Sequence, residues 1–455
     1  MKSINPYTGK TLKIYNPHSD HQIKETVERA QDTFLMWKKI GFEEKAHFLN
    51  KAADILESKK EHYAKLISLE MGKMLKESVA EIEKCAWVCR YYAEKAEGFL
   101  ADSPLDLPDD KKAKLKYNPL GVILAVMPWN FPFWQVFRFA APNLMVGNTG
   151  ILKHASNVPQ CALAIEEIFE EAGFPKGCFQ TLLISSDKVK SILQHPSVKA
   201  ATLTGSEKAG EIIASHAGEV LKKTVLELGG SDPFIVLADA DVEKAAKTAA
   251  KSRMINFGQS CIAAKRFIIH KKVYDKFVEV FKKEIEGLKQ GDQFDENADY
   301  CCMARPDLAE ELFAQVNKSI AMGAKVILEG SRPEEGKALF KPYIISDITP
   351  DMPAYHQEMF GPVATIFKIN SEEEAIKIAN DSPYGLGSSL WTSDMDKADE
   401  LAGQIESGAV FINELVASSP YLPFGGIKRS GYGRELAELG IKEFVNIKTV
   451  SFTQS

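Results

Sequence analysis

Gly121-Val122-Ile123-Leu124-Ala125-Val126 is an uninterrupted apolar run with the length of one buried β-strand. A second run, Gly150-Ile151-Leu152-Lys153, leads into a helical pattern from Cys161 to Ala172. The alternation continues through three further apolar runs, Phe179–Ile184, Ala200–Thr204 and Thr224–Leu228. Strands that alternate with helices predict a parallel sheet whose crossover connections are right-handed.

A second series of predicted strands and helices begins after Gly229-Gly230. The predicted strands are Phe234–Leu237, Arg266–Ile269, Val363–Ile369 and Gly408–Ile412, and predicted helices run to Met254, from Val273 and from Ser371. We therefore predict an α/β fold with two bodies that meet near these two glycines.

The N-terminal quarter of the chain has a different pattern. Apolar residues recur at spacings of three and four over residues 23–99, which predicts three helices with breaks near Gly41 and Gly72. Residues 101–116 are polar and hold Pro104 and Pro108, so we expect this segment to leave the main body.

Composition excludes several classes of protein. The 455 residues are 45% hydrophobic and 26% charged, ordinary values for two or three globular domains, and the net charge of −6 argues against a nucleic-acid partner. The N-terminus lacks a signal-peptide core, and no apolar run reaches the roughly 20 residues of a membrane span. Seven scattered cysteines favour a reducing cytoplasm, and no set of four converging ligands predicts a metal.

Two residues offer covalent chemistry. Cys261 lies on a glycine-bearing loop between two regular segments, and Glu227 ends an apolar, β-branched run. A thiol nucleophile with a separate carboxylate base suits a reaction that passes through a thioester. The alternative is that Cys261 is simply a small buried hydrophobic residue.

Asn130 and Arg138 are polar residues among apolar neighbours. Asn130 follows the first predicted strand, and its amide is a donor for a developing oxyanion; alternatively, it hydrogen-bonds the loop backbone. Arg138 stands in the run Phe137-Arg138-Phe139-Ala140-Ala141, where an unpaired charge would be costly to bury. Arg138 therefore either pairs with a carboxylate of the protein or binds a carboxylate ligand.

The segment from Thr204 to Gly210 joins a predicted strand to a predicted helix. A glycine turn at a helix N-terminus suits phosphate, because free N–H groups point at the anion. A plain tight turn explains the pattern equally well, since its glycines are five apart and do not form a GxGxxG fingerprint.

Five motifs, in this order over essentially the whole chain, resemble the aldehyde dehydrogenase superfamily. They are Pro128-Trp129-Asn130-Phe131-Pro132, Leu226-Glu227-Leu228-Gly229-Gly230, Gly258-Gln259-Ser260-Cys261, Glu358-Met359-Phe360-Gly361-Pro362 and Pro423-Phe424-Gly425-Gly426. Within the superfamily, Lys153 to Pro159 and residues 226–235 look most like the bacterial NAD(P)-dependent succinate-semialdehyde dehydrogenases.

The resemblance implies a catalytic role for each of three residues. Cys261 would attack the aldehyde carbon, and Asn130 with the backbone N–H of Cys261 would hold the oxyanion. After hydride passes to a nicotinamide, Glu227 would activate the water that releases the acid. A CoA-acylating dehydrogenase is disfavoured because it typically lacks the base at Glu227, and a non-catalytic protein because all three residues are present.

The resemblance also implies a dinucleotide site. Lys153 and Glu358 would bind the riboses, Trp129 would line the site, Phe360 would face the nicotinamide, and Gly205 with Ser206 would lie by the pyrophosphate. NAD-preferring relatives commonly carry a glutamate three residues after this lysine, whereas this chain has Ser156. A neutral hydroxyl does not repel a 2′-phosphate, so we expect NADP to be preferred, with NAD as the weaker cofactor.

Arg138 and Ser418 fall at positions where the family lines its aldehyde tunnel. An arginine and a serine in place of aromatic residues suit a short aldehyde with a distal carboxylate, such as succinate semialdehyde. Glutarate semialdehyde and a broader range of aliphatic aldehydes are the alternatives.

The family's domain plan gives the last expectations. Residues 1–100 and 119–228 would form the cofactor domain, residues 229–429 the catalytic domain, and residues 430–442 would return to the cofactor domain. Residues 101–118 and 443–455 match the family's oligomerisation strands. Because an alternating tail such as Phe444 to Phe452 would be a liability as a free edge, we expect a homodimer or homotetramer.

Overall fold

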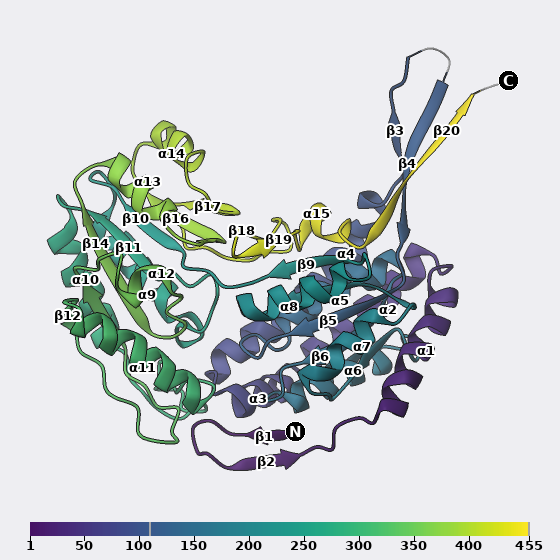
Figure 1. Ribbon diagram of the computed structural model, residues 1–455, viewed down its shortest axis with the longest axis horizontal. Helices are drawn as coiled ribbons and strands as arrows, with labels where there is room; N and C mark the ends of the chain where they lie inside the picture. The colour runs from purple at the N-terminus through teal and green to yellow at the C-terminus, as the bar shows by residue number, and fades with distance from the viewer. Residues whose placement is uncertain (109–110, 454–455) are drawn as a thin grey trace.

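The computed structural model describes residues 1–108 and 111–453 and contains two large sheets, each enclosed by helices (Figure 1). This confirms the predicted α/β class. The first sheet has the strand order β19-β9-β8-β5-β6-β7, in which all neighbours except β19 and β9 run parallel. Its strands are β5 (Val122–Met127), β6 (Thr149–His154), β7 (Phe179–Thr181), β8 (Val198–Thr204), β9 (Lys223–Glu227) and β19 (Gly431–Tyr432).

Strand β5 shows why these apolar runs form a central sheet. Val122 and Leu124 pack into a core on one face, whereas Ile123 and Ala125 pack into a different core on the other face. A strand buried on both faces needs a continuous apolar run rather than an alternating one. The helices that cover this sheet are α5 (Trp134–Val146), α6 (Pro159–Glu171), α7 (Val189–Gln194), preceded by the 3₁₀ turn Ser186–Lys188, and α8 (Glu207–Gly218).

The N-terminal region contains four helices rather than the three predicted. They are α1 (Asp20–Trp37), α2 (Phe42–Ser58), α3 (Lys60–Met71) and α4 (Leu75–Phe99). The breaks at Gly41 and Gly72 lie where predicted, but α2 and α3 are separated at Lys59, which leaves helical geometry at φ −114° and ψ 18°. Lysine is a good helix former, so no sequence signal marks this break.

The second sheet has the order β12-β13-β14-β11-β10-β16-β17 and is parallel except between β12 and β13. Its strands are β10 (Pro233–Val236), β11 (Arg266–His270), β12 (Lys325–Leu328), β13 (Tyr343–Ser346), β14 (Val363–Ile369), β16 (Gly387–Trp391) and β17 (Ala409–Ile412). Its helices are α9 (Val242–Met254), α10 (Tyr274–Glu286), α11 (Pro306–Ala321), α12 (Pro353–His356), α13 (Glu372–Asn380) and α14 (Met395–Ala402).

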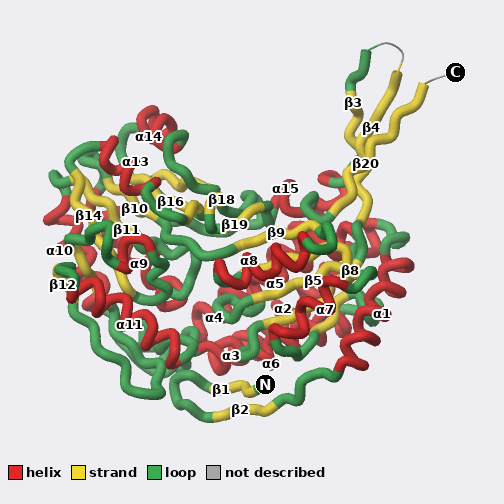
Figure 2. The backbone as a smooth tube through the Cα atoms, in the orientation of Figure 1, coloured by secondary structure: helices red, strands yellow, loops and turns green. Residues whose placement is uncertain are grey.

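A three-stranded antiparallel sheet projects from the body as an arm (Figure 2). It consists of β3 (Ser103–Leu105), β4 (Lys111–Pro119) and β20 (Val445–Thr453), in the order β20-β4-β3. Ile447 and Phe452 on β20 are 53% and 44% exposed, so the arm presents apolar side chains away from the body.

Small elements complete the described chain. They are β1 (Lys2–Ile4), β2 (Thr11–Ile14), β15 (Tyr384–Gly385), β18 (Ile427–Lys428), α15 (Ala437–Ile441) and the 3₁₀ turn Ile255–Gly258. Within residues 1–108 and 111–453, no helix has both the length and the apolar character needed to cross a membrane.

Candidate active site

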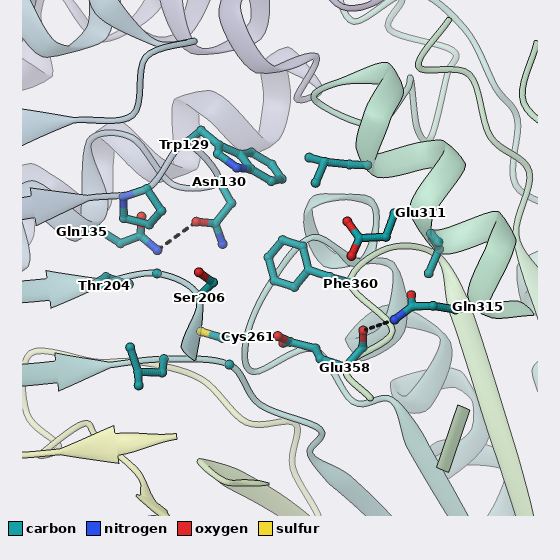
Figure 3. Close-up of a pocket in the computed structure, with 16 residues that line it drawn as sticks. Trp129, Asn130, Gln135, Thr204, Ser206, Cys261, Glu311, Gln315, Glu358 and Phe360 are labelled. Atoms are coloured by element: carbon teal, nitrogen blue, oxygen red, sulfur yellow. Dashed lines mark hydrogen bonds between the residues drawn. The ribbon is translucent and has the colours of Figure 1, made fainter. Parts of the chain in front are cut away.

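Cys261 lies where two cavities meet. One cavity, of about 290 Å³, is lined by Cys261, Asn130 and Phe360, and Figure 3 shows these side chains facing it. A second cavity, of about 260 Å³, is lined by Cys261 together with Arg138 and Ser418. The thiol is therefore accessible from two separate sides, which is the arrangement a nucleophile needs between a cofactor and a substrate.

The loop that carries Cys261 has an unusual backbone. Asn256 and Phe257 both have positive φ, 51° and 54°, a conformation that costs a non-glycine residue about 1 kcal/mol or more. Asn256 is held there because its N–H donates to Glu77 at 3.1 Å and its Nδ2 donates to the carbonyl of Asn130 at 2.7 Å. These contacts fix the loop against the segment that carries Asn130.

Two buried cations hold the carbonyl groups of the same loop. Arg253 donates to the carbonyls of Gly258 at 2.6 Å and Ala264 at 2.8 Å. Lys265 Nζ donates to the carbonyls of Ser260 at 2.8 Å and Cys261 at 2.7 Å. Burial raises the pKa of Cys261 to about 12, and the positive charges of Lys265 and Arg138 oppose that rise.

Asn130 is buried, and both the oxygen and the nitrogen of its side-chain amide form hydrogen bonds. Gln135 Nε2 donates to Asn130 Oδ1 at 3.0 Å, which directs Asn130 Nδ2 away from Gln135. Nδ2 donates to the carbonyl of Gln259 at 3.1 Å, so the loop-backbone alternative is present in the structure. An amide carries two hydrogens, and one remains for a ligand. Among the described residues, the backbone N–H of Cys261 has no hydrogen-bond acceptor.

Glu227 ends β9 and is only 2% exposed. Neither of its carboxylate oxygens has a hydrogen-bond partner in the described part of the chain. Burial, and then the negative charge of Glu435, raises the pKa of Glu227 well above its usual range. Glu227 is absent from the walls of both cavities that Cys261 lines.

Arg138, on α5, forms a buried ion pair with Glu435. This is one of the two alternatives that the sequence left open, namely pairing with a carboxylate of the protein. Arg138 also lies 4.6 Å from the centre of the Phe424 ring, while its Nη2 donates to Thr204 at 3.4 Å. Because the pair with Glu435 is neutral overall, Arg138 adds N–H groups to the cavity but little net charge.

Five of the predicted cofactor residues, Trp129, Gly205, Ser206, Glu358 and Phe360, line the cavity on the other side of Cys261. Trp129 and Phe360 pack edge to face, with ring centres 5.8 Å apart. Glu358 accepts from the N–H of Gly230 at 3.1 Å and forms an ion pair with Lys265 at 3.2 Å. Gly205 and Ser206 immediately precede α8 and line the same cavity, and the N–H of Gly205 donates to the carbonyl of Glu227 at 3.0 Å.

Lys153 and Ser156 lie beside this cavity rather than in its wall. Lys153 is the penultimate residue of β6, and Ser156 follows that strand. Because β6 pairs in parallel with β5, both residues lie at the same sheet edge as Trp129, which follows β5. Burial lowers the pKa of Lys153, and no described carboxylate pairs with it. An unpaired, half-buried lysine at the carboxyl edge of a parallel sheet suits an anionic group of a nucleotide. Ser156 is exposed.

Gln135, Asn256 and Lys265 belong to this site but were not predicted from the sequence. Gln135 and Asn256 orient Asn130 through contacts that no local pattern reveals. The sequence does indicate that Lys265 is buried, because Lys265 follows the apolar segment Ile262-Ala263-Ala264 and directly precedes a buried strand. A lysine at such a position must find buried partners.

A model of the aldehyde dehydrogenase family matches residues 1–450. A protein of Synechocystis sp. named probable succinate-semialdehyde dehydrogenase [NADP(+)] is 51% identical over 450 residues, 99% of each chain. A succinate-semialdehyde dehydrogenase [NADP(+)] of Mycobacterium avium is 50% identical, covering 99% of this chain and 96% of its own.

The solved structures agree with these relatives. The crystal structure of a succinic semialdehyde dehydrogenase from Streptococcus pyogenes, in complex with NADP+, is similar with a TM-score of 0.97. It is 41% identical, and the alignment covers 100% of both chains.

Proposed function

We propose that this chain, which belongs to the aldehyde dehydrogenase family, oxidises succinate semialdehyde to succinate with NADP⁺ as its preferred cofactor. The position of Cys261 between two cavities carries the proposal. The names of the relatives in Synechocystis and Mycobacterium avium support the choice of aldehyde and cofactor. NAD⁺ is the weaker cofactor.

The Cys261 thiol first gives its proton to a solvent water molecule, because the thiolate is the nucleophile. Its sulfur forms a bond to the aldehyde carbon, and the carbonyl π electrons move to the oxygen. Asn130 Nδ2 and the N–H of Cys261 donate to that oxyanion, which is most stabilised by donors fixed in advance. When bound, NADP⁺ supplies the ring that accepts the hydride. The oxyanion electrons re-form the carbonyl, and Cys261 then carries a thioester.

Glu227 releases the product by taking a proton from water as the water oxygen attacks the thioester carbon. The Cys261–carbon bond breaks and the sulfur leaves as thiolate. Because Glu227 is buried away from both cavities, its side chain must rotate toward Cys261 for this step. Burial raises the pKa of Glu227, which favours the protonated form, and only the deprotonated form can act as this base.

The residues on the cofactor side fit a phosphorylated dinucleotide. The backbone N–H groups at the start of α8, beside Gly205 and Ser206, would bind the pyrophosphate, and Trp129, Glu358 and Phe360 would hold the nicotinamide half. The unpaired Lys153 supplies positive charge for the adenosine 2′-phosphate. Ser156 carries no negative charge that would repel this phosphate.

The proposed domain plan follows the two sheets. Residues 1–100, 119–228 and 430–442 would form the cofactor domain, and residues 229–429 the catalytic domain. The arm, residues 101–118 and 443–455, would pair with another copy of the chain to give a homodimer or homotetramer; the exposed Ile447 and Phe452 support this. The proposed compartment is the cytoplasm, because none of the seven cysteines is in a disulfide.

Initial-rate kinetics with two aldehydes and two cofactors tests the proposed function. Succinate semialdehyde and butanal are each assayed with NADP⁺ and with NAD⁺. We expect the highest kcat/KM for succinate semialdehyde with NADP⁺. Comparable kcat/KM for both aldehydes would contradict carboxylate recognition, and a tenfold preference for NAD⁺ would contradict the cofactor assignment. If glutarate semialdehyde is the better substrate, the preferred aldehyde is longer than succinate semialdehyde.

A further inference from the structure

The hydroxyl group of Ser418 is left with a hydrogen that no protein group accepts. Ser418 is 8% exposed, and its Oγ accepts two hydrogen bonds, from Lys84 Nζ at 2.8 Å and Trp134 Nε1 at 3.1 Å. With both lone pairs engaged, the hydroxyl can only donate further. None of the described residues accepts from it, although a buried donor normally has a partner.

Lys84, on α4, has a positive charge without an anionic partner in the described chain. Its Nζ contacts only Ser418 and the face of the Trp134 ring, 4.2 Å from the ring centre. Burial, and then repulsion from Arg138, lowers the pKa of Lys84 to about 8. Lysine presents three donors, so two N–H groups remain free for a ligand.

The nearby acidic residues are already engaged elsewhere. Glu81 forms a buried ion pair with Lys73 at 2.5 Å and accepts from the N–H groups of Phe133 and Trp134. Glu77 accepts from the N–H of Asn256, and burial raises its pKa. Neither carboxylate therefore neutralises Lys84.

One cavity, of about 260 Å³, is lined by Lys84, Trp134 and Ser418. Glu77, Glu81 and Cys261 line the same cavity. The free donors on Lys84 and Ser418 form one cluster, whereas the charge of Arg138 in the same wall is matched by Glu435. The cavity thus offers its uncompensated positive charge at Lys84 and the nucleophile at Cys261.

We propose that Lys84 and Ser418 together bind the distal carboxylate of the aldehyde substrate, which makes Lys84 the residue that selects carboxylated aldehydes. This assignment rests on the proposed oxidation of succinate semialdehyde. It moves the charge recognition from Arg138, predicted from the sequence, to a lysine on the N-terminal helices. Trp134 positions both groups, because its indole N–H fixes Ser418 and its ring faces Lys84.

Substitution of Lys84 by Met removes the charge and keeps most of the side-chain volume. For Lys84→Met, we expect kcat/KM for succinate semialdehyde to fall about 30-fold or more, since truncating a buried charge partner has effects of this size. The kcat/KM of Lys84→Met for butanal should stay within about threefold of the wild-type value. The inhibition constant of succinate against butanal oxidation should rise by a factor similar to the loss with succinate semialdehyde. Lys95→Met, on the exposed end of the same helix, is the matched control.

Thermal unfolding separates recognition from a structural role. An apolar side chain in place of an unpaired, half-buried cation should leave the melting temperature of Lys84→Met unchanged or higher. Ser418→Ala is the second variant, and it should lose about tenfold in kcat/KM for succinate semialdehyde only. Lys84→Arg should recover part of the preference.

Two results would overturn the assignment and identify what failed. If the wild type prefers succinate semialdehyde and Lys84→Met keeps that preference, or loses both aldehydes equally, Lys84 does not bind the carboxylate. If the wild type oxidises butanal but neither prefers succinate semialdehyde nor is inhibited by succinate, the proposed substrate fails, and the assignment of Lys84 fails with it.

Discussion

Replacement of Glu227 by Gln should stop product release but leave the first hydride transfer intact. The amide has the shape of the carboxylate, and neither oxygen of Glu227 has a described hydrogen bond that the change would break. General-base assistance contributes about 10²- to 10⁴-fold in rate, which corresponds to about 3–5.5 kcal/mol of activation free energy. Steady-state turnover should fall by that factor.

Rapid mixing of Glu227→Gln with succinate semialdehyde and NADP⁺ tests this reasoning. The absorbance of reduced nicotinamide should rise in a burst of one equivalent per subunit, followed by a slow phase. Glu438→Gln is the matched control, because Glu438 is an exposed carboxylate on α15 that pairs with Lys442. Unchanged turnover without a burst would refute the role of Glu227, and so would the loss of the burst itself.

The same variant has a stability signature. The folded-state pKa of Glu227 lies above its unfolded value of about 4.3. The stability that this group contributes is therefore complete below the unfolded pKa and is lost as the pH rises through the folded pKa. Between pH 5 and alkaline pH, the melting temperature of the wild type should fall further than that of Glu227→Gln, and parallel curves would contradict a raised pKa of Glu227.

Four further changes have definite expected outcomes. Asn130→Ala should lower kcat about 10²- to 10³-fold, while iodoacetamide should still alkylate the thiol at an unchanged rate. Lys265→Met should slow alkylation of Cys261 at fixed pH, because a charge that lowers the thiol pKa is gone, and should lower the melting temperature; faster alkylation would contradict this. Ser156→Glu should shift the ratio of kcat/KM values toward NAD⁺ about tenfold or more, since a carboxylate repels a 2′-phosphate. Truncation after Phe444 removes β20 and should reduce the mass measured by light scattering to that of a smaller assembly, whereas an unchanged mass would argue against the arm.

The fold was largely predictable because its signals are local. A strand buried on both faces requires a continuous apolar run, and residues 121–126 supply one. The break at Lys59 was not predictable, since a good helix former stands there and tertiary packing decides the geometry.

The site was predictable only where a motif carries it. Cys261, Asn130 and Phe360 stand in recognisable segments, and the structure brings them to one cavity. The partner of Arg138 could not be named, because Glu435 lies almost 300 residues away in the sequence. Lys84 is one of several lysines on an amphipathic helix, and only the packing of α4 against residue 418 distinguishes it.

The most direct test of the chemistry at Cys261 is to trap its acyl intermediate. Glu227→Gln is mixed with succinate semialdehyde and NADP⁺, quenched in acid and digested, and the peptide that contains Cys261 is analysed by mass spectrometry. A succinyl group on Cys261, removed by hydroxylamine and missing in a Cys261→Ser background, is the predicted result. Reduced cofactor formed in one equivalent per subunit without any acyl group on Cys261 would contradict a thioester mechanism at this residue.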